Sequence, residues 1–149
     1  MCYYTSCNNA NGGKTLMAEK KTVFLTGASG HMGWAGFKEL YKKKDKLNIV
    51  LLLRDSEKNR KKFANYLNDP SVKIVWGDLK KYDDVLKCVE GSDYVLHVGG
   101  MVSPSADYYP TKTIQTNTTA AKNIVDAVKA QPNKDDIKVI GIRHGEKMY

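Results

Sequence analysis

An apolar stretch at residues 22–26 of this 149-residue chain runs directly into three glycines spaced by three. Glycine permits a sharp turn after a strand and lets backbone approach a ligand closely. The residues that follow have a helical pattern, and the first N–H groups of a helix attract anions. We therefore expect a pyrophosphate-binding turn; the alternative is a turn that only packs a helix on a sheet. The predicted contact residues are Gly27, Ser29, Gly30, His31, Met32 and Gly33.

A second chemical signal follows the next apolar stretch, residues 48–53. It ends in Arg54 rather than in an acidic residue that would bind a ribose 2′-hydroxyl. A guanidinium offers a planar fork for a 2′-phosphate, to which Lys58 or Arg60 could add, so NADP is the predicted cofactor. NAD is the alternative, with Asp55 turned toward the ribose or Arg54 merely solvated.

Strands and helices alternate along the rest of the chain. Strands are predicted at 22–26, 48–53, 72–76, 94–98 and 137–142, and helices at 31–44, 57–67, 82–88 and 113–129, with a loop at 99–110. This pattern predicts an α/β fold, a Rossmann-type doubly wound parallel sheet of about five strands in the order 3-2-1-4-5. The ligand crevice should lie where Val98, Gly99 and Gly100 meet the glycine turn.

Length and composition predict a single folded domain at 21–142, a disordered extension at 1–20 and a tail at 143–149. No apolar stretch is long enough to span a bilayer, and the N-terminus lacks the apolar core of a signal peptide, so a cytoplasmic protein without a membrane partner is expected. Three unevenly spaced cysteines predict free thiols and no metal site.

The formal net charge is +8, from 24 Lys and Arg against 16 Asp and Glu. A solvated surface with some lysines near a phosphate-bearing cofactor explains this excess, because no nucleic-acid motif accompanies it. We expect no nucleic-acid partner; the weaker alternative is a basic nucleic-acid-associated protein.

Residues 26–33 read TGASGHMG, and four further segments follow in order: Arg54-Asp55, Gly77-Asp78-Leu79, strand 94–98 with its two glycines, and 116–123. Together they resemble the cofactor-binding half of extended short-chain dehydrogenases/reductases, the NAD-dependent epimerase/dehydratase and dihydroflavonol-reductase-like enzymes. The resemblance covers about residues 21–142 and implies a nicotinamide dinucleotide cofactor.

The resemblance also suggests roles for individual residues. It implies that Asp78 and Leu79 line the adenine pocket, although Asp78 could equally cap the following helix. Gly99 and Gly100 replace two alanines common in the family and would leave room for ribose and nicotinamide. Asn117 matches an asparagine that orders the active site, with local hydrogen bonding as the alternative. His97 is expected to be a satisfied core imidazole with no chemical role.

The family's reaction needs a serine or threonine just after the fifth strand and a YxxxK pair further on. The chain has one literal YxxxK, from Tyr108 to Lys112, but it precedes the last predicted helix and contains Pro110. We interpret it as a chance match and assign no catalytic residue. Residues 140–149 resemble a segment near the far end of nucleotide-sugar dehydratases and epimerases, which suggests a truncated or recombined chain; a solvated tail is the alternative.

The sequence thus predicts an NAD(P)-binding domain resembling an epimerase/dehydratase or an NADPH-dependent carbonyl reductase, without its catalytic Ser, Tyr and Lys. A carbonyl or nucleotide-sugar substrate would require the missing half. The alternative function is a non-enzymatic dinucleotide-sensing or interaction module. The fifth strand is expected to leave an open apolar edge through which copies of the chain associate.

Overall fold

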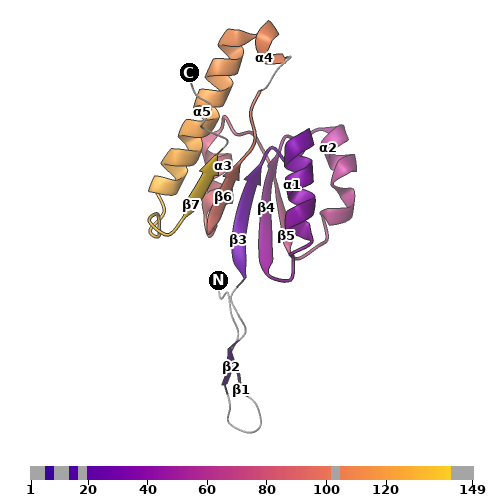
Figure 1. Cartoon of the computed structure of the whole chain (residues 1–149), viewed down its shortest axis with the longest axis vertical. Helices are drawn as coiled ribbons and strands as arrows, with labels where there is room; N and C mark the ends of the chain where they lie inside the picture. Colours follow the sequence, from indigo (N-terminus) through magenta and orange to yellow (C-terminus); the bar gives the residue numbers. More distant parts are fainter. Residues whose placement is uncertain (1–5, 9–13, 17–19, 102–104, 142–149) are drawn as a thin grey trace.

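A five-stranded parallel sheet forms the centre of the computed structural model, which describes residues 6–8, 14–16, 20–101 and 105–141 (Figure 1). The strands are β3 (Lys21–Thr26), β4 (Leu47–Leu53), β5 (Val72–Trp76), β6 (Tyr94–His97) and β7 (Lys138–Gly141). Their order is β5-β4-β3-β6-β7, and every neighbouring pair is parallel. The predicted doubly wound fold and its 3-2-1-4-5 order are confirmed.

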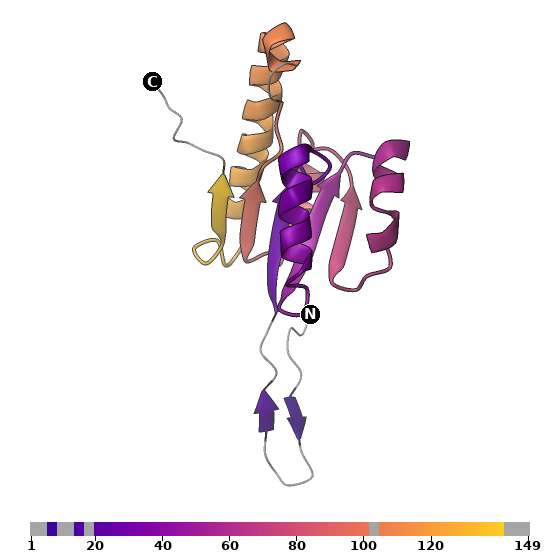
Figure 2. The same cartoon turned by 45° about the vertical axis from the view of Figure 1, so that its right-hand side comes forward.

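Helices cover both faces of the sheet. They are α1 (His31–Tyr41), α2 (Glu57–Lys62), the 3-10 helix η1 (Ala64–Tyr66), α3 (Tyr82–Val89), α4 (Ser105–Tyr108) and α5 (Pro110–Lys129). Figure 2 shows α1 on one side of the sheet and α5 on the other. Crossover helices on both faces are what parallel strands require.

Alternation along the buried strands supplies two cores. Phe24 and Val50 pack with α3 and α5 residues such as Val85 and Ile124. Their chain neighbours Leu25 and Leu51 point to the other face and pack with Phe37 of α1 and with Phe63. A strand that is buried on both faces reads as a continuous apolar run, which explains the composition of residues 48–53.

The helix boundaries differ from the sequence predictions by more than one residue in several places. Helix α1 ends at Tyr41 rather than at residue 44. The helix predicted over 57–67 breaks at Phe63, whose backbone leaves the helical region (φ −101°, ψ 8°) while its ring becomes fully buried; η1 follows. The predicted loop 99–110 contains the short helix α4, and α5 begins at Pro110, an allowed first-turn position for proline.

Two short strands precede the sheet. Strands β1 (Ser6–Asn8) and β2 (Lys14–Leu16) pair antiparallel, an element that the sequence did not predict within residues 1–20. The other residues of that segment, Ile142 and the predicted tail at 143–149 lie outside the described residues.

The β7 edge of the sheet pairs with β6 only, as far as the structure describes the chain. Val139 and Ile140 are exposed there, Ile140 by 54%. Within the same described ranges, none of the helices has the length and apolar character needed to cross a bilayer.

Candidate cofactor-binding site

The turn after β3 is built around Gly27, which has a positive φ of 75°. A Cβ atom on Gly27 would lie 2.7 Å from Cα of Gly99, and one on Gly33 would lie 1.8 Å from the carbonyl oxygen of Gly27. The Gly30 N–H donates to that same oxygen at 3.0 Å. Contacts within the protein therefore require the glycines at 27 and 33, as predicted for the turn and for helix packing.

Gly30 differs from the other two glycines. It precedes α1 with φ −78°, which any residue can adopt, and it is exposed. A Cβ atom there would meet only the Gly27 oxygen, at 3.4 Å. Packing within the protein therefore does not require glycine at this position, whereas a ligand approaching the start of α1 would need a bare backbone.

Ser29, His31 and Met32 surround this bare surface. Ser29 is half-buried, and its carbonyl oxygen accepts from Nζ of Lys62 at 3.1 Å. His31 and Met32 form the exposed first turn of α1, which contains no acidic residue. The start of α1 is therefore accessible and suited to an anion.

The carboxyl ends of β3 and β6 are joined by side chains as well as by the sheet. Thr26 pairs in register with His97, and its Oγ1 lies 2.9 Å from Nδ1 of His97. The N–H groups of Val98 and Gly99 donate to the same Oγ1 at 3.0 and 2.8 Å. The structure thus brings the glycine turn and the end of the fourth sheet strand together, as predicted.

His97 is hydrogen-bonded, as expected for a satisfied core imidazole. Burial lowers the pKa of His97 below its usual range, so the neutral ring is favoured. In the sequence, Thr26 stands out only as the first residue of the glycine motif. Its position at the end of β3, directly opposite the end of β6, is the signal that could have identified its connecting role.

Leu79 comes to the same edge from the loop after β5. A Cβ atom on Gly99 would lie 2.8 Å from Cδ1 of Leu79. The Leu79 carbonyl accepts from Nδ2 of the buried Asn123 in α5 at 2.8 Å, an anchor that no sequence pattern indicated. Leu79 and Gly99 are therefore neighbours across the sheet edge.

Asp78 is not the cap of α3, so that alternative is wrong. The residue preceding α3 is Lys81. The Asp78 carboxylate instead accepts from the Lys80 N–H at 2.9 Å, and the Asp78 N–H donates to Asp84 at 3.0 Å. Asp78 remains partly exposed in a fixed turn.

Asn117 ties α5 to the loop after β6. Its Oδ1 accepts from the Met101 N–H at 2.8 Å, and its Nδ2 donates to the Met101 carbonyl at 3.1 Å. A Cβ atom on Gly100 would lie 3.2 Å from that Oδ1. The asparagine therefore bonds to a distant loop rather than within its own helix, which holds the segment after Gly100 in place.

Arg54 follows β4 and is exposed. Its backbone carbonyl accepts from Nδ2 of Asn59 at 2.7 Å, and in the described part of the chain its guanidinium has no hydrogen-bond or ion-pair partner. Asp55 is bonded to Arg60 instead, which lowers the pKa of the Asp55 carboxyl. Arg54 and Lys58 are thus the cations available at this corner, whereas Arg60 is engaged.

The literal YxxxK sequence does not form a pair on one helix. Tyr108 ends α4 and is 77% exposed, whereas Lys112 belongs to α5, which begins at Pro110. The two residues lie on different helices, so they lack the common helical spacing that the family's pair needs.

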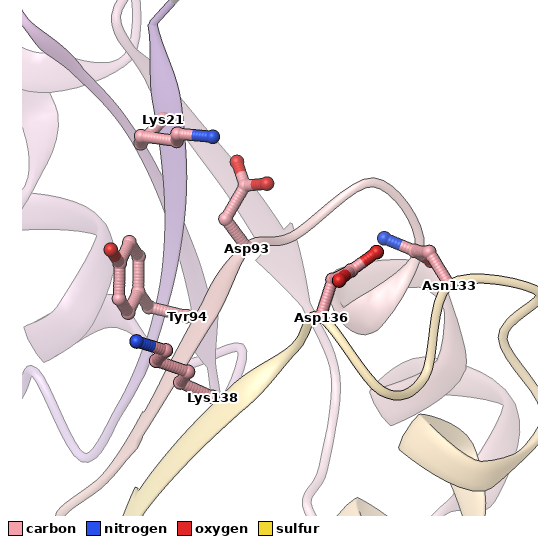
Figure 3. Close-up of a pocket in the computed structure, with 6 residues that line it drawn as sticks. All are labelled: Lys21, Asp93, Tyr94, Asn133, Asp136 and Lys138. Carbon is pink, nitrogen blue, oxygen red and sulfur yellow. The ribbon is translucent and has the colours of Figure 1, made fainter.

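Two open pockets of about 360 and 390 Å³ lie away from the glycine turn. The first is at the amino ends of β3, β6 and β7 (Figure 3). Its lining residues are Lys21, Asp93, Tyr94, Asn133, Asp136 and Lys138. No three His, Cys, Asp or Glu side chains within the ranges described come together in a way that could hold a metal ion.

Comparisons with known proteins agree with this geometry. A model of the NAD(P)H-binding family matches residues 27–142. UDP-glucose 4-epimerase of Rickettsia felis is 32% identical over 133 residues, which cover 87% of this chain and 38% of the relative. The corresponding protein of Rickettsia bellii is 32% identical over 111 residues, covering 72% of this chain and 32% of the relative.

Solved structures show the same fold. Pen from Bacillus thuringiensis is 27% identical with a TM-score of 0.69, over 82% of this chain and 36% of that protein. A dTDP-glucose 4,6-dehydratase from Bacillus anthracis in complex with NAD is 14% identical with a TM-score of 0.63, over 81% and 36%. The chain spans about a third of the length of the curated relatives it matches. It belongs to the NAD(P)H-binding family, as a domain similar to the cofactor-binding part of short-chain dehydrogenases/reductases of the epimerase/dehydratase type.

Proposed function

We propose that this NAD(P)-binding domain prefers NADP(H) and serves as the cofactor half of an enzyme related to nucleotide-sugar epimerases, dehydratases or NADPH-dependent carbonyl reductases. The observation that carries the preference is the corner after β4. Arg54 is exposed there with an unengaged guanidinium, while the neighbouring carboxylate of Asp55 is bonded to Arg60. A 2′-phosphate is a dianion that suits such a guanidinium.

The rest of the proposed site follows the carboxyl edge of the sheet. The bare backbone at Gly30 and the start of α1 would receive the pyrophosphate. Leu79 and Asp78 would contact the adenine, and Val98, Gly99 and Gly100 would lie along the ribose and nicotinamide. The position of this backbone beside the glycine turn supports the proposal, because a Cβ atom on Gly27 would lie only 2.7 Å from Cα of Gly99.

A nicotinamide bound at this edge would supply hydride transfer to or from a carbonyl or hydroxyl carbon. The contribution of the chain itself is to bind and orient: Thr26 fixes the Val98–Gly99 backbone, and Asn117 fixes Met101. We assign no proton donor, because Tyr108 and Lys112 lie on different helices. We therefore expect the chain to bind the nicotinamide cofactor but not to catalyse turnover of a substrate.

Titration of the purified chain with NADPH and with NADH, followed by ligand fluorescence, tests the preference. We expect NADPH to bind at least about tenfold more tightly, the scale of one charge-assisted contact. Arg54→Ala should remove most of this difference. Lys134→Ala removes one positive charge near the opposite edge of the sheet and should leave the ratio unchanged. Equal affinities, or tighter NADH binding, in the unaltered chain would contradict the proposal.

A dinucleotide-sensing or interaction module is the second candidate function, favoured by the separation of Tyr108 from Lys112. NADPH oxidation with a panel of carbonyl and nucleotide-sugar substrates distinguishes it from an intact enzyme. Binding without oxidation would support the module. Turnover that disappears in Tyr108→Phe would show instead that the YxxxK sequence is functional.

We also propose that copies of the chain associate through the β7 edge. Val139 and Ile140 are exposed on this strand, and an unpaired apolar edge favours strand pairing with another molecule. Sedimentation velocity should reveal oligomers, and Ile140→Lys should shift them toward monomer. A monomer at all accessible concentrations would contradict this interface.

A further inference from the structure

The loop between β4 and α2 places two opposite charges next to each other, Arg54 and Asp55. Under the proposed function, this loop meets the 2′ position of the cofactor. A guanidinium there attracts a 2′-phosphate, whereas a free carboxylate repels the phosphate and accepts from the 2′-hydroxyl of NAD(H). The preference therefore depends on where the Asp55 carboxylate points.

Arg60 holds that carboxylate in a two-point contact. Its Nε lies 2.6 Å from Oδ1 of Asp55, and its Nη2 lies 2.8 Å from Oδ2. Both side chains are about half exposed, at 53% for Arg60 and 55% for Asp55. An exposed pair is usually weak, but a two-point guanidinium–carboxylate contact fixes the direction of both groups.

Trp76 gives the Arg60 guanidinium a second support. The Arg60 Cζ atom lies 4.7 Å from the centre of the Trp76 ring. Trp76 ends β5, in register with Leu53 at the end of β4. Because the ring belongs to a strand that pairs with β4, it limits the positions that the guanidinium can take.

The backbone of the loop is fixed as well. Ser56 caps α2 by accepting from the Asn59 N–H at 3.2 Å, and the buried Asn59 side chain donates to the Arg54 carbonyl at 2.7 Å. The side chains of Arg54 and Asp55 therefore project from a backbone that is held in place by these hydrogen bonds. The Asp55 carboxylate cannot turn toward a ribose without breaking both contacts with Arg60.

From this geometry we infer that Arg60 is a positioning residue for cofactor choice: it holds the Asp55 carboxylate away from the 2′ position and leaves Arg54 to bind the phosphate. The inference rests on the proposed NADP(H) preference. It assigns Arg60 an indirect effect, which differs from direct contact with the phosphate.

A double-mutant cycle separates the two roles of Arg60. In Arg60→Ala the released Asp55 should weaken NADPH binding and tighten NADH binding, lowering the preference on the order of tenfold. Asp55→Asn alone should leave NADPH binding equal or tighter. The double variant should recover NADPH affinity to within about threefold of the unaltered chain, because the repelling charge is gone.

Lys61→Ala is the matched control, because it removes the next cation along the same helix together with its exposed pair to Glu57. It should leave the ratio of the two affinities unchanged. Trp76→Phe should keep the preference, and Trp76→Ala should lower it in the same direction as Arg60→Ala. Thermal melting of each variant checks that loss of binding is not loss of folding.

The outcomes distinguish this inference from the function on which it rests. If the unaltered chain shows no NADPH preference, both fail. If the preference is present but Arg60→Ala leaves the ratio unchanged, only the role of Arg60 fails. If Arg60→Ala weakens NADPH alone and Asp55→Asn does not restore it, Arg60 contacts the phosphate itself and the positioning role is wrong.

Discussion

Thr26 and His97 share one hydrogen bond, with 2.9 Å between Oγ1 and Nδ1, at the point where β3 and β6 end. The threonine oxygen also accepts from the N–H groups of Val98 and Gly99. A hydroxyl has two lone pairs and one proton. Because the two N–H groups occupy both lone pairs, we infer that the Thr26 hydroxyl donates to Nδ1, which assigns the proton of a neutral His97 to Nε2.

Replacing Thr26 by valine should destabilise the fold and weaken nucleotide binding. Valine keeps the shape, but the N–H groups of Val98 and Gly99 lose their acceptor at a fully buried side chain. Leaving a buried donor unpaired costs about 1–3 kcal/mol, and these two N–H groups are partly buried, so we expect a loss of about 1–2 kcal/mol in the free energy of unfolding. Chemical denaturation measures the loss.

Thr26→Ser is the control for this substitution, because it keeps the hydroxyl and removes only a methyl group. It should retain most of the stability and the nucleotide affinity. Equal stabilities of the valine and serine variants would contradict the role assigned to the hydroxyl.

The free energy of unfolding should decrease as the pH drops from about 6.5 toward the lower pKa of folded His97. Burial lowers the pKa of folded His97 relative to its usual value of 6.5 in the unfolded chain. Between those two pKa values the unfolded state binds the proton and the folded state does not. The contribution of neutral His97 to the free energy of unfolding is therefore fully present above about pH 6.5 and is lost as the pH falls toward the pKa of the folded state.

His97→Asn provides the comparison, because asparagine offers an acceptor to Thr26 and does not titrate. The free energy of unfolding, measured between pH 8 and pH 5, should depend less on pH in this variant. That range avoids the titration of Asp69. The hydrogen bond from Tyr41 is the largest cause that lowers the pKa of Asp69 to about 2, so its contribution to stability is lost only at lower pH. Identical slopes for the two chains would contradict the assignment.

Alanine at the three glycines around the start of α1 should give three different results. Gly33→Ala places a Cβ atom 1.8 Å from the Gly27 oxygen and should cost about 3 kcal/mol or more. Gly30→Ala should change stability by less than about 0.5 kcal/mol while weakening NADPH binding clearly. Gly36→Ala, with nothing within 4 Å of its Cβ, should stabilise the helix by about 0.5–1 kcal/mol and leave binding unchanged.

Thermal or chemical unfolding and NADPH titration of the same samples test this series. The decisive result is the separation of stability from affinity at Gly30. If Gly30→Ala binds NADPH as tightly as Gly36→Ala does, the pyrophosphate does not approach that backbone, and the proposed position of the cofactor is wrong.

The alternation of strands and helices could be predicted because its signals are local in the sequence, and the rule of right-handed crossovers then gives the order of the sheet. Residues 48–53 form a continuous apolar run, and the glycines at 27, 30 and 33 follow a strand and precede a helix. The break of the helix at Phe63 could not be predicted, because the helical sequence pattern continues through this residue. The break accompanies the burial of the Phe63 ring in the cluster that includes Phe37 of α1. Helix α4 could not be predicted either, because it lies within a stretch rich in Gly, Ser and Pro, which is typical of a loop.

The candidate site divides in the same way. The sequence by itself determined the glycine turn, the family and the presence of Arg54, because these depend on residue type and spacing along one strand–helix unit. Only the tertiary structure decided that Asp55 is held by Arg60 over Trp76, and that Thr26 connects β3 to β6. The physical reason is that the Arg60–Trp76 and Thr26–His97 contacts depend on register between strands distant in sequence. The Asp55–Arg60 pair depends on the path of the loop after β4, which residue types and spacing do not specify either.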